Sequence, residues 1–349
     1  MDILRNINSE KFSFSIVLPP KSPFIEVLHT HGFETIEILD ITHPLRKLTS
    51  YLKIFGLIRR TKPDLIFINQ AGIQKVFSYM GLLNKTPMVS EVSTLEDALL
   101  VNKFNKYLFN PVNSFICNSE FIASKLEVPN SKKSVLYYGY EWKNLSPVLR
   151  KDKEPFKLVL LGRISESKGH FLLIEAVNDL RIRRPDIQIE VYFVGNAPNK
   201  EIEAEIRLKI SHHKLDKVFV FRGFQRDINR EIMDKNLMVI PSLQEPFGRI
   251  FCETAEAQLL CVVSDSGGLG ELSKRFDLGI LFESRNYKSL SEMIEYCYDN
   301  YDKVSANFKT KAHNFLNRLN KKEYISAIDE ILSSALTGKD VSIKWLGNE

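Results

Sequence analysis

Two carboxylates flank a Pro-Phe-Gly turn in the second half of this sequence. Glu245 comes directly before the turn, and Glu253 lies in the segment that follows it. The preceding residues 237–241 form a short apolar run typical of a buried strand, whereas the residues after Gly248 have a helical pattern. A strand-to-helix loop of this kind presents free backbone N–H groups at the positive end of the helix, which suits a phosphate. Carboxylates beside that phosphate can accept hydrogen bonds from sugar hydroxyls.

Two cations follow another apolar strand earlier in the same half of the chain. Residues 156–161 are predicted to form this strand, which ends at Gly162 and is followed by Arg163 and Lys168. In a parallel α/β sheet the loops after the carboxyl ends of strands bind ligands, so both cations are expected to project into a crevice. Arg can bind two phosphate oxygens at once, and Lys acts as a compact point charge. The order of these features is the order that a single nucleotide pocket would need.

Each feature also has a simpler interpretation. In that interpretation, Glu245 and Glu253 are ordinary helix charges, and Arg163 and Lys168 are exposed basic side chains on a surface loop. We favour the nucleotide pocket because the cationic loop and the pair of carboxylates occur together in one α/β half.

The elements that must position these residues alternate along most of the chain, which predicts an α/β fold with parallel sheets and crossover helices. The predicted strands form one series in each half. They cover residues 13–18, 34–39, 64–69, 87–92, 114–117 and 133–138, then 156–161, 188–194, 217–221, 237–240, 260–264 and 278–282. The polar segment 141–155, with its two prolines, is predicted to be an interdomain linker.

These motifs resemble those of retaining glycosyltransferases of the GT-B type, often called family four or group one. The residues that carry the resemblance are Gly162-Arg163, Lys168-Gly169, Phe193-Val-Gly195, Pro241-Ser242, Glu245-Pro-Phe-Gly248, Glu253, Ser264-Asp-Ser-Gly-Gly268 and Glu271. The resemblance implies two Rossmann-like domains facing a cleft. It places an acceptor-side domain at 1–140, the linker at 141–155, a nucleotide-sugar donor domain at 156–303, and helices at 304–349 that cross back to brace the first domain.

The resemblance implies three catalytic residues. Arg163 and Lys168 would hold the donor pyrophosphate, and Glu245 would contact the hydroxyls of the donor sugar. Charge grows on the pyrophosphate as its bond to the sugar stretches, so fixed cations there lower the barrier. Enzymes of the other large glycosyltransferase fold usually use an Asp-any-Asp metal site, and this sequence contains no such triplet. We therefore expect no metal and no cofactor, and the resemblance implies front-face attack assisted by the leaving phosphate.

The resemblance also implies donor-binding positions on the loops around the same pocket. These positions are Gly162, Gly195, Phe247, Gly248, Arg249 and Glu253. Glu253 would bind the ribose, and backbone amides around Phe247 and Gly248 would meet the distal phosphate. The implied partners are a nucleotide-diphosphate sugar and a saccharide or lipid-linked acceptor, in the synthesis of surface glycans or polysaccharides.

Two other functions are compatible with the same architecture. A nucleotide-sugar epimerase would need acid and base residues around the sugar ring, and the sequence offers no such set. A non-catalytic member would bind a nucleotide sugar or a partner transferase. The segment Met88–Thr94 leaves this open because it lacks the histidine that the family often has there, with Glu91 and Ser93 as candidates for its place. A second departure is Gln258, which replaces a Gly that normally takes the left-handed conformation after a helix.

Composition indicates a soluble cytoplasmic enzyme. The chain has 349 residues, 44% of them hydrophobic and 26% charged, which favours a globular protein of two domains. Its apolar runs are shorter than a membrane span, and the first residues lack the apolar core of a signal peptide. Four cysteines without paired spacing are expected to be buried thiols. The net charge of +5 is spread through the chain and does not indicate nucleic-acid binding.

One predicted helix in the first half is both basic and amphipathic. Its cations are Arg46, Lys47, Lys53, Arg59, Arg60 and Lys62, and its apolar residues are Leu48, Leu52, Phe55, Leu57 and Ile58. Such a helix can lie on an anionic membrane surface, which would make the enzyme peripheral at the cytoplasmic face. The favoured alternative is a crossover helix that packs its apolar face on the sheet.

The first residues suggest that the chain begins late relative to the family. Residues 1–12 resemble the end of the first long helix, and residues 14–18 resemble the second strand of the family fold. On this interpretation the first, central strand is missing. The competing interpretation makes residues 13–18 the first strand and residues 19–23 a loop without glycine.

Overall fold

The computed structural model describes residues 2–7, 11–18, 22, 24–33, 35–38, 44–69, 77, 85–105, 112–141, 155–338 and 342–345. The chain divides into two compact units. The first comprises residues 1–118, 122–139 and 321–348, and the second comprises residues 119–121 and 140–320. The predicted linker at 141–155 lies outside the described residues except at its two ends.

A six-stranded parallel sheet forms the centre of the second unit. Its strands are β7 (Phe156–Leu161), β8 (Ile189–Val194), β9 (Phe219–Gly223), β10 (Leu237–Ile240), β11 (Cys261–Ser264) and β12 (Ile280–Phe282). They are arranged in the order β12-β11-β10-β7-β8-β9. The order reverses between β7 and β10, which is the topological switch point where open α/β sheets bind their ligands.

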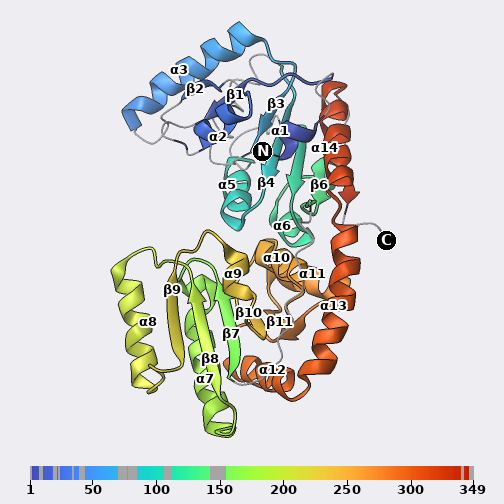
Figure 1. The fold of residues 1–349 in the computed structure, drawn as a ribbon. Coiled ribbons are helices and arrows are strands. Elements are labelled where there is room, and N and C mark those ends of the chain that lie inside the picture. Colours follow the sequence, from blue (N-terminus) through green and yellow to red (C-terminus); the bar gives the residue numbers. More distant parts are fainter. Residues whose placement is uncertain are drawn as a thin grey trace. The chain divides into compact units, whose positions relative to one another are not determined.

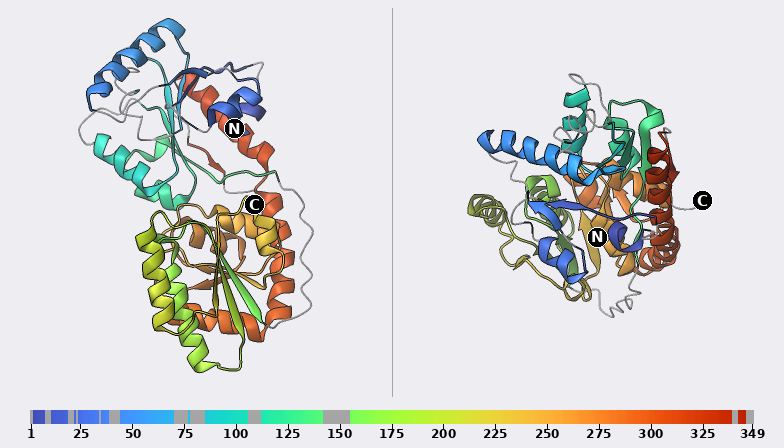
Figure 2. Two further views of the ribbon diagram at one scale, coloured as in Figure 1. Left: turned by 60° about the vertical axis from the view of Figure 1, so that its left-hand side comes forward. Right: turned by 90° about the horizontal axis from the view of Figure 1, so that it is seen from above.

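Helices lie on both faces of this sheet, as Figures 1 and 2 show. They are α7 (His170–Arg183), α8 (Lys200–His212), α9 (Ile228–Ile232), α10 (Arg249–Glu256), α11 (Gly267–Phe276), α12 (Tyr287–Asp299) and α13 (Tyr301–Arg318). Because both faces are covered, the inner strands β10 and β11 are continuous apolar runs rather than alternating ones. All residues of β10 and β11 are buried.

The predicted helical region 304–349 divides between the two units. Helix α13 belongs to the second unit, where Phe315 meets Phe251 of α10 with ring centroids 5.5 Å apart. Helix α14 (Lys321–Leu336) belongs to the first unit. The bracing of the first domain that we expected from the whole region therefore comes from α14 and the residues after it.

In the first unit the described strands form a five-stranded parallel sheet and a separate pair. The sheet has the order β13-β6-β5-β4-β3. Its strands are β3 (Ile66–Ile68), β4 (Met88–Val92), β5 (Ser114–Cys117), β6 (Lys133–Leu136) and β13 (Lys344–Trp345). Strands β1 (Ile16–Leu18) and β2 (Thr35–Ile38) pair in parallel with each other. The chain before β1 contains the short helix α1 (Asp2–Asn6).

Helix α14 covers one face of the five-stranded sheet. Ile328 and Ile331 belong to a buried cluster that includes Val89, Ile116 and Leu136 from three neighbouring strands. Helix α1 also contacts α14. The core of the first unit thus combines early and late segments of the chain.

The remaining helices of the first unit are shorter or partly described. They are α2 (Phe24–Thr30), α3 (Pro44–Thr61), α5 (Leu95–Asn105) and α6 (Glu120–Lys125). On α3, Ile54, Leu57 and Ile58 are buried, as expected of a crossover helix, whereas Leu52 is 64% exposed. Among the described helices, none has the length and apolar character needed to cross a membrane.

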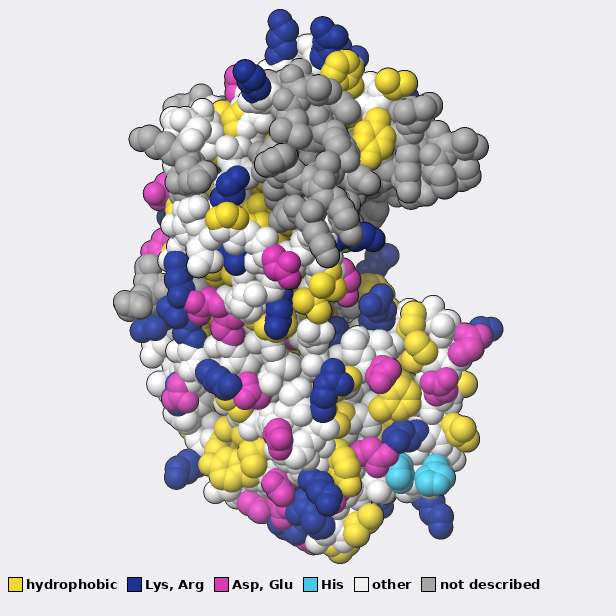
Figure 3. All heavy atoms as spheres, turned by 180° about the vertical axis from the view of Figure 1, so that it is seen from behind, with side chains coloured by type: hydrophobic (Ala, Val, Ile, Leu, Met, Phe, Trp, Pro, Cys, Tyr) yellow, Lys and Arg dark blue, Asp and Glu magenta, His cyan; other side chains and the backbone are white. Residues whose placement is uncertain are grey.

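The four cysteines are buried free thiols, as predicted. On the face drawn in Figure 3, Lys and Arg side chains are interspersed with Asp and Glu side chains.

Candidate functional site

The cationic loop begins where β7 ends at the switch point. Gly162 has a φ of +138°, and Arg163 is exposed, with no ion-pair partner in the described part of the chain. A Cβ atom on the neighbouring Gly195 would lie 2.0 Å from the carbonyl oxygen of Gly162. The loops after β7 and β8 therefore approach so closely that only glycine fits at position 195, which explains the glycines of the two motifs.

A second close approach joins this loop to the chain after β10. Gly169 has a φ of +76°, and a Cβ atom there would lie 2.0 Å from the carbonyl oxygen of Pro241. The backbone N–H of Leu243 donates to the carbonyl oxygen of Ser167 over 2.9 Å. Because β7 and β10 are adjacent strands, loops that are far apart in sequence meet at this edge of the sheet.

The meeting of these loops pairs a predicted cation with a predicted carboxylate. Lys168 Nζ lies 2.6 Å from Glu245 Oε2. The hydroxyl of Ser242 donates to the same carboxylate oxygen over 3.2 Å. Glu245 is the more enclosed of the charged pair, with 15% of its side chain exposed against 33% for Lys168. Two of the three residues predicted to be catalytic are thus in direct contact.

The loop carrying Glu245 packs against the segment Ser266–Gly268 at the start of α11. The backbone N–H of Gly268 donates to the carbonyl oxygen of Glu245 over 2.8 Å. A Cβ atom on Gly268 would lie 2.0 Å from the carbonyl oxygen of Pro246. The hydroxyl of Ser266 donates to the carbonyl oxygen of Ser242 over 2.8 Å. The segment fixes the backbone of the Glu245 loop by close packing and hydrogen bonds.

The turn after Glu245 leads into α10. Phe247 is buried, and Gly248 precedes the helix with a φ of +107°. Arg249, whose side chain is 73% exposed, places Nε 3.4 Å from Glu253 Oε1. The other oxygen, Glu253 Oε2, is buried and has no hydrogen-bond partner among the described residues. Burial raises the pKa of Glu253 above its usual range, partly offset by the charge of Arg249, while Glu256 raises it further.

An orphaned carboxylate oxygen of this kind is unusual, because buried polar atoms normally have a partner. A hydroxyl donor from a bound molecule would satisfy Glu253 Oε2. The structure therefore brings Lys168 to Glu245, Gly162 to Gly195, and Arg249 to Glu253. Arg163 stays exposed at the end of β7.

One residue of the cationic loop was not predicted to matter. His170 is fully buried, its Nδ1 lies 3.2 Å from the carbonyl oxygen of Ser165, and its ring packs against Phe193 with centroids 4.8 Å apart. Burial lowers the pKa of His170 to about 4. The imidazole is therefore neutral near pH 7 and supports the loop from within the core. The one sequence feature that could have pointed to His170 is its position directly after Lys168-Gly169.

The first unit contains a buried polar cluster at the carboxyl ends of its strands. Ser93 Oγ donates to Glu91 over 2.8 Å, and the Tyr138 hydroxyl donates to Glu91 over 2.9 Å. Asn69 donates to the other carboxylate oxygen. Burial raises the pKa of Glu91 above its usual range. The two residues considered as replacements for the missing histidine are thus hydrogen-bonded to each other, and Asn69 and Tyr138 complete the cluster.

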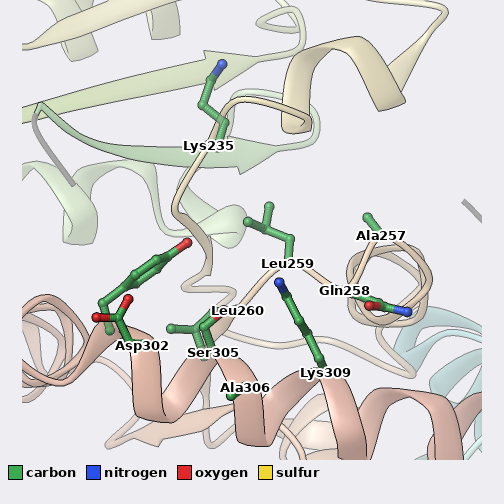
Figure 4. Close-up of a pocket in the computed structure, with 10 residues that line it drawn as sticks. Lys235, Ala257, Gln258, Leu259, Leu260, Asp302, Ser305, Ala306 and Lys309 are labelled. Atoms are coloured by element: carbon green, nitrogen blue, oxygen red, sulfur yellow. The ribbon is translucent and has the colours of Figure 1, made fainter. Parts of the chain in front are cut away.

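A cavity of about 210 Å³ lies elsewhere in the second unit. Figure 4 shows Asp302, Ser305 and Lys309 of α13 facing the loop that carries Gln258 and Leu259. This loop precedes β11, so the cavity is at the amino end of the parallel strands, opposite the switch-point loops. Gln258 has a φ of +53°, so it adopts the left-handed conformation usually given to glycine.

Residues 143–315 match the sequence model of the family described as Glycosyl transferases group 1. An uncharacterized glycosyltransferase of Methanocaldococcus jannaschii is 23% identical over 270 residues, covering 73% of this chain and 74% of that protein. The crystal structure of Anabaena HepE in complex with UDP superposes with a TM-score of 0.77 at 21% identity, covering 91% of each chain. The apo form of the lipopolysaccharide outer core galactosyltransferase WaaB gives 0.73 at 13% identity, covering 97% of this chain and 94% of WaaB. The predicted α/β fold of two Rossmann-like domains, the GT-B fold, is confirmed.

Proposed function

We propose that this chain is a retaining group 1 glycosyltransferase that uses a nucleotide-diphosphate sugar, because the family model matches residues 143–315, which make up most of its second unit. The acceptor would be a saccharide or a lipid-linked saccharide, in the synthesis of surface glycans. The Anabaena neighbour has been solved with UDP and with UDP-glucose, which makes a uridine-diphosphate sugar the first donor to test.

The observation that carries the proposal is the convergence of two loops at the switch point of the second sheet. One loop brings Arg163 and Lys168, and the other brings Glu245, into the region where α/β sheets bind nucleotides. In the proposed complex, Arg163 and Lys168 bind the pyrophosphate, and Glu245 accepts hydrogen bonds from the donor sugar. Glu253, whose buried oxygen has no hydrogen-bond partner in the described part of the chain, accepts one from the ribose.

The proposed reaction breaks the bond between the anomeric carbon and the oxygen of the distal phosphate. The electron pair of that bond passes to the phosphate oxygen, whose growing charge Arg163 and Lys168 stabilise. An acceptor oxygen attacks from the face that the phosphate leaves, and its proton passes to the departing phosphate. Attack from this face retains the configuration at the anomeric carbon. These side chains supply the positive charge that the mechanism needs, so the proposed enzyme works without a metal ion.

The test is release of nucleoside diphosphate from a panel of nucleotide sugars, after a screen for thermal stabilisation by the same compounds. A ligand at a hundred times its dissociation constant adds about 2.7 kcal/mol of stability, which such a screen detects readily. Arg163→Ala should reduce turnover by about two or more orders of magnitude, the scale for loss of one transition-state donor. The matched control is Arg181→Ala, an exposed arginine on α7 of the same unit.

Three outcomes are informative. Turnover near wild type in Arg163→Ala would remove this residue from the pyrophosphate site. Binding of a nucleotide sugar without release of diphosphate, in the presence of a range of acceptors, would favour a non-catalytic member of the family. Conversion of the sugar to an isomer would identify an epimerase.

A further inference from the structure

Lys168 and Glu245 form an ion pair in the structure, whereas the proposed function requires each of them to bind a different part of the donor. The ammonium and the carboxylate are 2.6 Å apart, so each is already the main electrostatic partner of the other. The proposed function gives them different partners, the pyrophosphate for Lys168 and the sugar hydroxyls for Glu245. Either the pair opens when the donor binds, or Lys168 serves both groups at once.

The surroundings of Glu245 determine the consequence of opening the pair. Its side chain is only 15% exposed, so water replaces a lost partner poorly. Without Lys168, the described contact of the carboxylate is the Ser242 hydroxyl at 3.2 Å. The backbone of the loop is fixed by the hydrogen bond from Gly268 to Glu245, which hinders the carboxylate from swinging into solvent.

We propose that the Lys168–Glu245 pair makes the site discriminate between the intact nucleotide sugar and the free nucleoside diphosphate. This inference rests on the proposed function. Pyrophosphate binding draws Lys168 from Glu245 in both complexes. In the complex with the intact donor, sugar hydroxyls replace the ammonium as hydrogen-bond donors to the carboxylate. In the complex with the diphosphate alone, the partly buried carboxylate is left with Ser242.

This exchange of partners at Glu245, from the Lys168 ammonium to the sugar hydroxyls, has a consequence for turnover. After glycosyl transfer the sugar leaves with the acceptor, and the diphosphate product then holds Lys168 while Glu245 lacks its second partner. Re-formation of the ion pair favours departure of the product. The same pair therefore weakens product binding without weakening donor binding to the same extent, which is the selectivity a transferase needs when its product resembles its donor.

The test compares the affinities of UDP and UDP-glucose for the whole chain by calorimetry, with ADP, GDP and their glucose esters in parallel. In Glu245→Gln the carboxamide keeps the shape but no longer binds Lys168 as an ion pair. We expect UDP to bind about tenfold more tightly, because a charge-assisted hydrogen bond no longer has to be broken. The affinity for UDP-glucose should increase less, because the sugar loses its carboxylate partner. The ratio of the dissociation constant of UDP to that of UDP-glucose should therefore fall, by up to about tenfold.

Two further variants make the result specific. In Lys168→Met combined with Glu245→Gln, the gain in UDP affinity relative to Lys168→Met alone should disappear, since no ammonium remains to be released. Glu205→Gln, at an exposed position on α8, removes the same charge from the second unit and should leave the ratio unchanged. Melting temperatures verify that each variant is folded.

The outcomes separate this inference from the proposed function. Unchanged or weaker UDP binding in Glu245→Gln would overturn the exchange and indicate that Lys168 bridges phosphate and carboxylate. If Glu245→Gln still increased the affinity for UDP in the Lys168→Met background, the exchange would also be overturned, because the effect would then be long-range electrostatics. A wild-type chain that binds none of the six nucleotides would refute the proposed donor class itself, and the exchange with it.

Discussion

Replacement of Glu253 by Gln should move stability and affinity in opposite directions. The substitution keeps the shape of the side chain and removes its charge. In the structure, one carboxylate oxygen is buried without a hydrogen-bond partner among the described residues, and the other lies 3.4 Å from Arg249. Burial raises the pKa of Glu253 above its value in the unfolded chain. The stability contributed by its protonated form is complete below the unfolded pKa and is lost as the pH rises through the folded pKa.

At pH 7, therefore, the wild-type protein carries the cost of an ionised, poorly satisfied carboxylate. That cost is about 1 to 3 kcal/mol for a buried polar group without a partner. The carboxamide keeps a polar atom at this position, so Glu253→Gln removes at most this cost. Since 1 kcal/mol corresponds to about 2 to 4 °C for a unit of 150 to 250 residues, the melting temperature of the second unit should rise by up to about 12 °C. The difference should shrink toward pH 4, where the wild-type carboxyl becomes protonated in both states.

Binding should change in the other direction. The ribose hydroxyl keeps a neutral amide acceptor in place of a charged one. A hydrogen bond to a charged group is worth about 1.5 to 3 kcal/mol and one to a neutral group about 0.5 to 1.5 kcal/mol, so Kd should rise by about tenfold. Differential scanning calorimetry gives the stability, and titration calorimetry with UDP gives the affinity. Glu205→Gln on α8 is the control, with both quantities expected to stay near wild type. A lower melting temperature with unchanged UDP affinity would refute the reasoning and make Glu253 a structural residue of α10.

Four further predictions concern local geometry, pH and metals. Gln258→Gly should stabilise the second unit by about 1 kcal/mol, since the native φ of +53° costs nothing for glycine; a lower melting temperature would show that the side chain is needed. Gly169→Ala should lower the melting temperature at least twice as far as Gly223→Ala, because both have positive φ but the added Cβ meets backbone at 2.0 Å only in the first and a side-chain oxygen at 3.5 Å in the second. His170, with its pKa lowered to about 4, should make the protein lose stability as the pH falls from about 6.5 toward 4, and His170→Gln should flatten this loss in pH-dependent melting curves. Excess chelator should leave diphosphate release unchanged, and abolition that manganese or magnesium reverses would contradict metal independence.

The strands were predictable because buried parallel strands are uninterrupted apolar runs. The predicted segments 156–161 and 237–240 coincide with β7 and β10. The strand β13 could not be found in this way, since Lys344–Trp345 contributes two residues and no apolar run. Its pairing with β6 depends on the preceding helix returning the chain to the sheet edge.

The candidate site was predictable in its residue types and less so in its contacts. Loops after strand ends could be identified from sequence, which pointed to Lys168 and Glu245 separately. Their ion pair depends on β7 and β10 being neighbours, a property of strand order that local patterns do not contain. Gln258 is the opposite case, in which the sequence departs from the expected residue but the local geometry is unchanged. It adopts the left-handed conformation after α10 although the resemblance led us to expect a glycine there.

The first unit is assembled from the beginning and the end of the chain, which has a consequence for its biosynthesis. On the ribosome, residues 140–320 of the second unit emerge before α14 and β13 of the first. Until those last segments appear, the edge of β6 lacks its partner and the apolar face of Val89, Ile116 and Leu136 lacks its cover. At about 5 to 20 residues per second, the first unit remains incomplete for as long as residues 140–320 are being synthesised. The nascent chain therefore presents an open sheet edge and an apolar face to chaperones while the second unit is already able to fold.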